Sequence, residues 1–306
     1  MIKSRYFPDK TFNSKAELFD AIKKDEARIK ALKKAETIYG HERGHLSKSN
    51  VTIKDGASKA LTIEDGYIYP VISTTNYIDS HGDVHIDGCF KKTVQEQQGK
   101  IFYAKNHDVS VGSIIAWPED VEMMIQKLDF SVLGKDYKSQ AECLIFKIDK
   151  EAIEDDDAED IIEKNRPVQN SIRMQYVNFV TCINDKRPEY KTEKANWDKY
   201  YPMIANKEVA DAEGYFWAVL ELKIVTEGSM VIKGSNDATP ILQIPSPEED
   251  MMCDNCGADM SGQYCAGCGK PRKSEPSKDT NNSKEAAKAL TEQKKKELLT
   301  KLIKKQ

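Results

Sequence analysis

The sequence has 306 residues, of which 39% are hydrophobic and 31% charged, a balance typical of a soluble globular protein with polar extensions. This length accommodates one domain of roughly 200 to 250 residues plus appendages. No apolar run approaches the roughly 20 residues that cross a bilayer, and residues 1–20 lack an apolar signal core. We therefore expect a cytosolic protein without a membrane partner.

The formal net charge of -4 is distributed unevenly along the chain. Residues 270–306 contain 12 Lys or Arg and 5 Asp or Glu, a charge of +7, so the remaining residues carry -11. A body this acidic argues against a nucleic-acid-binding zinc protein. The basic tail, by contrast, could touch nucleic acid or an acidic protein surface.

The predicted elements begin with a helix over residues 14–34, where Ser14 and Glu17 form a capping-box pattern. Residues 40–66 are polar and read as a loop. Short β-branched or aromatic segments then predict strands, with an acidic helix at 150–164 between them. The strands are expected at 67–73, 112–117, 122–131, 142–148, 171–180, 215–224 and 229–232. So many short strands favour a closed or strongly curved sheet.

Pro245 and Pro247 predict a rigid linker after the last strand, and we end the main domain there. The expected parts are an N-terminal helical segment at 1–45, a β domain at 46–245, a linker with a cysteine module at 246–272, and a basic tail at 273–306. The Lys-rich end of that tail is a helix candidate that should be unfolded alone and become helical on a partner.

The cysteine module contains four of the seven cysteines of the chain, Cys253, Cys256, Cys265 and Cys268. Two residues separate the members of each pair and eight separate the pairs. This spacing predicts a small ribbon with one structural Zn²⁺, because four thiolates leave no open position for a catalytic water. A redox dithiol pair and a module without metal are the alternatives.

Four short motifs carry the candidate chemistry: Asn76-Tyr-Ile-Asp-Ser-His-Gly-Asp-Val-His-Ile-Asp-Gly88, Asn106-His-Asp108, Asn170-Ser-Ile-Arg-Met-Gln-Tyr176 and Thr226-Glu-Gly-Ser-Met-Val231. Their order and spacing over residues 67–242 resemble the prohead proteases of tailed phages, which are similar in fold to herpesvirus maturational proteases. The resemblance implies an α+β fold with a closed, mostly antiparallel β-barrel surrounded by helices. It also implies a Ser nucleophile and a His base, which correspond here to Ser171 and His107.

Independently of the resemblance, the residues around His107 indicate a polar turn, where an imidazole stays partly solvated and can act as a base. Ser171 opens a strand in which it alternates with Ile172, so Ser171 and Arg173 should project from the same face. The oxyanion of acyl transfer needs donors, which the region of Arg173 could supply. The family has Gly at the position of Arg173, so this residue either assists the oxyanion or marks a member that has lost catalysis.

The third catalytic member should orient the imidazole. Glu227 occupies the position of the acidic residue of the family, while Asp108, Asp83 and a second histidine remain alternatives. His81 and His85 are an unsuitable metal pair, because residues four apart in an extended segment are separated by about 13 Å.

The resemblance implies a serine endopeptidase of capsid maturation that cleaves scaffold or capsid-protein extensions in the procapsid. Its partners would be the major capsid protein and the scaffold, and it would act in the host cytoplasm inside the procapsid or virion. The alternative is a catalytically inactive assembly or scaffolding protein that retains the protease fold.

Overall fold

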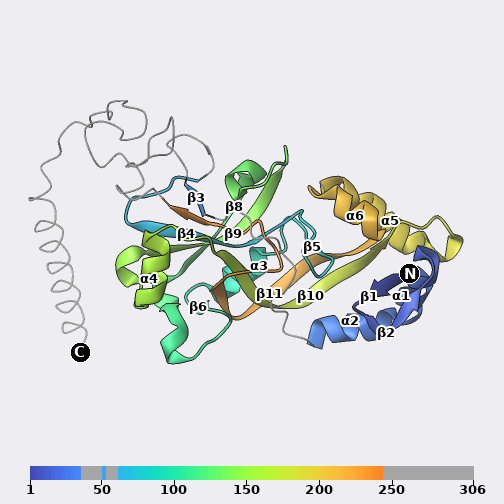
Figure 1. Ribbon diagram of the computed structural model, residues 1–306, viewed down its shortest axis with the longest axis horizontal. Helices are drawn as coiled ribbons and strands as arrows, with labels where there is room; N and C mark the ends of the chain where they lie inside the picture. Colours follow the sequence, from blue (N-terminus) through green and yellow to red (C-terminus); the bar gives the residue numbers. More distant parts are fainter. Residues whose placement is uncertain (36–49, 53–60, 244–306) are drawn as a thin grey trace, which may run out of the picture. The chain divides into compact units, whose positions relative to one another are not determined.

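The computed structural model describes residues 1–35, 50–52 and 61–243 (Figure 1). The chain divides into two compact units, Met1–Ser246 and Pro247–Gln306, and the described residues lie in the first. They form an α+β structure with three sheets and six α-helices. None of these helices is both long and apolar enough to cross a membrane. The cysteine module and the basic tail lie outside the described residues.

The N-terminal elements are a two-stranded sheet of β1 (Ile2–Ser4) and β2 (Phe7–Phe12), followed by α1 (Lys15–Lys24) and α2 (Glu26–Ala35). The single helix predicted over residues 14–34 is thus two helices separated at Asp25. Ser14 caps the first of them, because its Oγ accepts a hydrogen bond from the Glu17 backbone N–H at 3.2 Å.

The first five-stranded sheet is built around two long strands, β10 (Gln169–Ile183) and β11 (Tyr215–Val231), which pair antiparallel. Its strand order is β10, β11, β6 (Phe102–Lys105) and β7 (Ile114–Ala116), and β5 (Asp83–His85) pairs with another part of β11. The strands predicted separately at 215–224 and 229–232 are therefore one strand. A register shift interrupts its pairing with β10, close to Thr226 with its φ of 74°.

The second five-stranded sheet has the order β3 (Asn50–Thr52), β12 (Ile241–Gln243), β4 (Tyr67–Thr74), β9 (Gln140–Asp149) and β8 (Glu122–Asp129). Side chains of both sheets share one core. At Gly228 of β11 a Cβ atom would lie 2.8 Å from Phe146 Cε2 and 2.9 Å from Ile72 Cγ2. The sheets therefore approach so closely at this point that only glycine fits.

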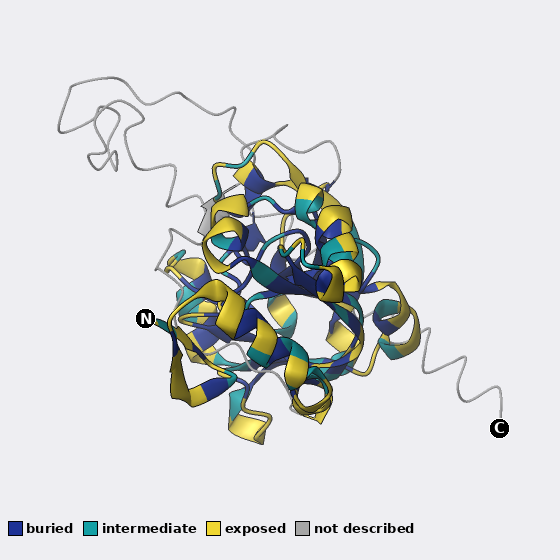
Figure 2. Ribbon diagram, turned by 90° about the vertical axis from the view of Figure 1, so that its right-hand side faces the viewer, coloured by how far each residue is buried: buried dark blue, intermediate teal, exposed yellow. Residues whose placement is uncertain are grey.

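Four further helices complete the described chain: α3 (Lys91–Gln97), α4 (Asp156–Glu163), α5 (Lys191–Tyr200) and α6 (Lys207–Glu213). The helices are exposed along their outer faces, whereas most of the strand residues are buried (Figure 2). The acidic helix expected at 150–164 is shorter than predicted, and α4 packs through buried Ala158 and Ile162.

The predicted closed barrel is wrong. Within the described ranges no sheet closes, since the first sheet ends at β10 and β7 and the second at β3 and β8. The pairing of the described strands is mostly antiparallel, as predicted, although β5 and β6 run parallel to β11 and β3 runs parallel to β12. Closure would require pairing between sheet edges, but at Asn170 the edge of β10 instead binds the segment before β12, through a hydrogen bond from its backbone N–H to the Thr239 carbonyl at 2.9 Å.

Lys33 of α2 connects the N-terminal elements to the first sheet. Its Nζ lies 2.6 Å from Asp83 Oδ1, and the two side chains are 8% and 0% exposed. The ammonium group also lies 5.4 to 5.7 Å from the ring centroids of Tyr6, Tyr176 and Trp217. Three aromatic faces and one carboxylate thus surround a single buried cation.

We predict that Lys33→Met destabilises the full-length protein by about 3–5 kcal/mol, because it leaves the buried Asp83 carboxylate without its counter-charge. Denaturant unfolding followed by tryptophan fluorescence measures this loss. Lys30→Met is the control, since the ion pair of Lys30 with Glu26 is partly exposed and should contribute no more than about 1 kcal/mol. Equal losses for the two variants would contradict the prediction.

Candidate functional site

The candidate site centres on the carboxylate of Glu227, which is fully buried in β11. His107 Nδ1 lies 3.0 Å from Glu227 Oε1, and Ser229 Oγ donates a hydrogen bond to Glu227 Oε2 at 2.6 Å. A carboxylate oxygen only accepts, so Nδ1 carries the proton of the neutral imidazole and the lone pair is on Nε2. Nε2 is therefore the atom of His107 that can take up a proton.

The turn that carries His107 has an unusual backbone. Asn106 and His107 both have left-handed conformations, with φ of 52° and 60°. Non-glycine residues hold this conformation only where their surroundings fix it. Here the His107 N–H donates to Ser229 Oγ at 3.1 Å, and the Arg173 guanidinium donates to the His107 carbonyl at 2.8 Å.

The position of Ser171 relative to the site follows from the pairing of β10 with β11. It is paired with Ser229 in the antiparallel ladder of β10 and β11, and directly opposed residues carry their side chains on the same face, with Cβ atoms about 4.5–5.5 Å apart. Ser171 is thus next to the residue that contacts both His107 and Glu227. The structure thus brings His107 and Glu227 into direct contact and places Ser171 on the neighbouring strand, opposite Ser229.

Two of the alternative acids have other partners. The Asp108 carboxylate accepts hydrogen bonds from Ser110 and Ser113 within its own loop, and these bonds lower its pKa. Asp83 binds Lys33 and accepts a hydrogen bond from the Tyr176 hydroxyl at 2.8 Å. Among the candidates, Glu227 is the acid that contacts His107.

Ser171 also lines a cavity of about 10 Å³, room for one water molecule. Its polar wall includes Ser73, Asp79, Asp83 and His85. The Ser73 hydroxyl lies 2.8 Å from His85 Nδ1, which makes this a second Ser–His contact. Burial lowers the pKa of His85 to about 4, so this ring is a poor base at neutral pH.

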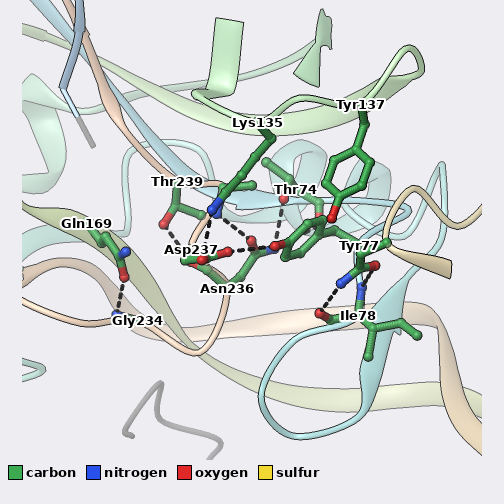
Figure 3. Close-up of polar contacts among 12 residues, drawn as sticks. Thr74, Tyr77, Ile78, Lys135, Tyr137, Gln169, Gly234, Asn236, Asp237 and Thr239 are labelled. Carbon is green, nitrogen blue, oxygen red and sulfur yellow. Dashed lines mark hydrogen bonds and ion pairs between the residues drawn. The ribbon is translucent and has the colours of Figure 1, made fainter. Parts of the chain in front are cut away.

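Ser235 and Asn236, from the segment 233–240, also line this cavity. Asp237 accepts from the Tyr77 hydroxyl at 2.8 Å and forms an ion pair with Lys135 at 2.8 Å, while Asn236 donates to Thr74 Oγ1 at 2.7 Å (Figure 3). The segment is therefore anchored to the second sheet and to the edge of β10. Ser171 is 4% exposed and His107 is 5% exposed. The expectation of a partly solvated His107 is wrong, because its ring binds the buried Glu227 while Ser229 and Arg173 bind its backbone.

The structure does not support the predicted zinc site. The described residues contain no group of three or more His, Cys, Asp or Glu that could hold a metal ion. Cys253, Cys256, Cys265 and Cys268, the predicted ligands, lie outside the described residues. The other three cysteines, Cys89, Cys143 and Cys182, are buried free thiols.

In comparisons with protein-family models, with curated proteins and with solved structures, nothing matches the chain. The resemblance to prohead proteases therefore rests on the four motifs, and its functional implications stay predictions.

Ser229 was not among the residues predicted from the sequence, although its hydroxyl links the His107 backbone to Glu227. The signal was available, because Glu227 and Ser229 are two residues apart in a strand and so share a face. The contacts of Lys33 with Asp83 had no such signal, since 50 residues separate them along the chain.

We predict that Asp79→Asn stabilises the protein relative to wild type at pH 7–8 but not near pH 4. Burial and the nearby charge of Asp83 raise the pKa of Asp79 to about 7, against a usual value of 3.8. The folded state therefore holds a proton that the unfolded chain releases, and stability falls between these pH values as the pH rises. Asn lacks this ionisation and can still accept the N–H bonds of His81 and Asp83.

Melting temperatures at pH 4, 6 and 7.5 measure the difference between the Asp79→Asn variant and the wild type. The control is Asp9→Asn at an exposed position, which should not stabilise the protein at pH 7.5. A constant difference for Asp79→Asn would contradict the prediction.

Proposed function

We propose that the chain is a serine endopeptidase of phage capsid maturation. The observation that supports it most is the direct contact of His107 with buried Glu227, beside the strand position of Ser171. The catalytic roles follow from atom types: a carboxylate that fixes the imidazole, an imidazole with its lone pair on Nε2, and a hydroxyl on the neighbouring strand. The capsid substrates follow from the motif resemblance.

In the proposed reaction, Ser171 Oγ attacks the carbonyl carbon of a peptide bond while His107 Nε2 takes the hydroxyl proton. The resulting tetrahedral intermediate collapses, the C–N bond breaks, and the leaving amine takes the proton from His107. Water then attacks the ester on Ser171 and gives its proton to Nε2, and the carboxylic acid leaves as Ser171 is reprotonated. Glu227 keeps the ring oriented and stabilises the imidazolium in both steps.

A second candidate is an assembly protein that retains this fold without catalysis. The burial of both Ser171 and His107 favours it, because a peptide could reach the hydroxyl only after the residues around it move. Reactivity of Ser171 distinguishes the two candidates, since an inactive assembly protein has no activated serine.

We predict that a fluorophosphonate probe labels Ser171 of the full-length protein, and that Ser171→Ala and His107→Ala each abolish the labelling. Peptide mass spectrometry identifies the labelled residue. On any cleaved substrate, Ser171→Ala/His107→Ala should be no worse than either single variant, because nucleophile and base act as a unit. Glu227→Gln should be milder, since it removes charge and orientation but leaves both reacting groups.

Ser73→Ala is the matched control, because Ser73 forms the other Ser–His contact and should be dispensable for labelling. Absence of labelling in wild type, or its loss in Ser73→Ala but not in Ser171→Ala, would overturn the assignment of Ser171. The first of these outcomes supports the assembly protein.

A further inference from the structure

We propose that Arg173 is the positioning residue of the candidate site: its guanidinium locks His107 in its left-handed conformation and holds Glu227 against the imidazole. The catalytic consequence rests on the proposed function, whereas the structural role can be measured without it.

Three groups hold His107 in place. Its N–H binds Ser229 Oγ, its carbonyl binds Arg173, and its ring binds Glu227. Two consecutive left-handed non-glycine residues, Asn106 and His107, relax unless such contacts hold them. Arg173 supplies the contact on the carbonyl side, directly next to the ring that must keep its direction.

The guanidinium group of Arg173 lies between the His107 backbone and the Glu227 carboxylate. One of its ends donates to the His107 carbonyl at 2.8 Å, while Nε lies 3.3 Å from Glu227 Oε1. The same oxygen is the partner of His107 Nδ1. A planar fork connects backbone and carboxylate at a fixed spacing, which the single ammonium group of Lys does not reproduce. Arg173 thus couples the turn conformation to the acid that orients the ring.

Charge also links Arg173 to Glu227. The Glu227 side chain is 0% exposed and the Arg173 side chain 17% exposed. A buried carboxylate needs a compensating charge. Arg173 provides a permanent positive charge at this carboxylate, so the charge of Glu227 is compensated within the site.

These contacts assign Arg173 to the histidine and its acid. The sequence also allowed a role for Arg173 in stabilising the oxyanion. That role predicts different behaviour of the Arg173 variants. Arg173 lies two residues after Ser171 on β10, at a register shift between Ile172 and Met174, and its guanidinium reaches both His107 and Glu227.

The test uses the full-length protein with Arg173→Met, Arg173→Lys and the control Arg166→Met. Arg166 forms a half-exposed ion pair with Asp160 away from the site. The first measurement is the proton NMR signal of His107 Nδ1–H, identified by its loss in His107→Gln. We expect the signal in wild type and in Arg166→Met, and its loss or a marked shift in both Arg173 variants.

The second measurement is the rate of Ser171 labelling by a fluorophosphonate. A misplaced base typically costs about 100-fold, so we expect that loss in Arg173→Met. Added methylguanidinium should restore part of the rate by filling the vacated position, and methylammonium at the same concentration should not.

An unchanged Nδ1–H signal in the Arg173 variants overturns the proposal. If the labelling rate falls while the signal is unchanged, Arg173 serves the oxyanion instead and the positioning role is wrong. If the wild type does not react with the probe, the proposed function fails, and the NMR signal alone decides the role of Arg173. If Arg173→Met does not fold, the same two measurements on Arg173→Lys, which retains the charge, test the proposal.

Discussion

The burial of the Glu227 carboxylate is the constraint on which the site depends. Removing a carboxylate from water is costly unless charge and hydrogen bonds compensate, and here His107, Arg173 and Ser229 surround it. These partners come from a loop after β6, from β10 and from β11 itself. One carboxylate therefore fixes the relative positions of three neighbouring parts of the first sheet, and its loss would disturb all of them together.

The close approach of the two sheets makes this burial possible. Gly228 lies between Glu227 and Ser229 and admits Phe146 and Ile72 of the second sheet against the back of β11. The front of the same strand then presents Glu227 and Ser229 to the site. Within three consecutive residues the strand thus packs against the core on one face and presents Glu227 and Ser229 on the other, so the site lies directly against the packed core.

Local pattern predicted some features of the site and missed others for physical reasons. Strand alternation predicted a shared face for Ser171 and Arg173, where the ladder in fact has a register shift, and the motif position indicated Glu227, which contacts His107. The prediction of a closed barrel was wrong because the number of strands does not determine which sheet edges pair. The edge of β10 binds the segment at Thr239 instead. The burial of His107 was also missed, since a polar turn reads as exposed unless its partners, distant in sequence, are known.

The aromatic enclosure of Lys33 has a consequence for how the chain can be shortened. A protein that begins after Ala35 would contain Asp83 in its interior without a cation, with the faces of Tyr176 and Trp217 open to water. The helix α2 therefore fills a binding site for a cation within the same chain. Any binding partner that supplies a lysine or another ammonium group at the same depth would compete for the place of α2.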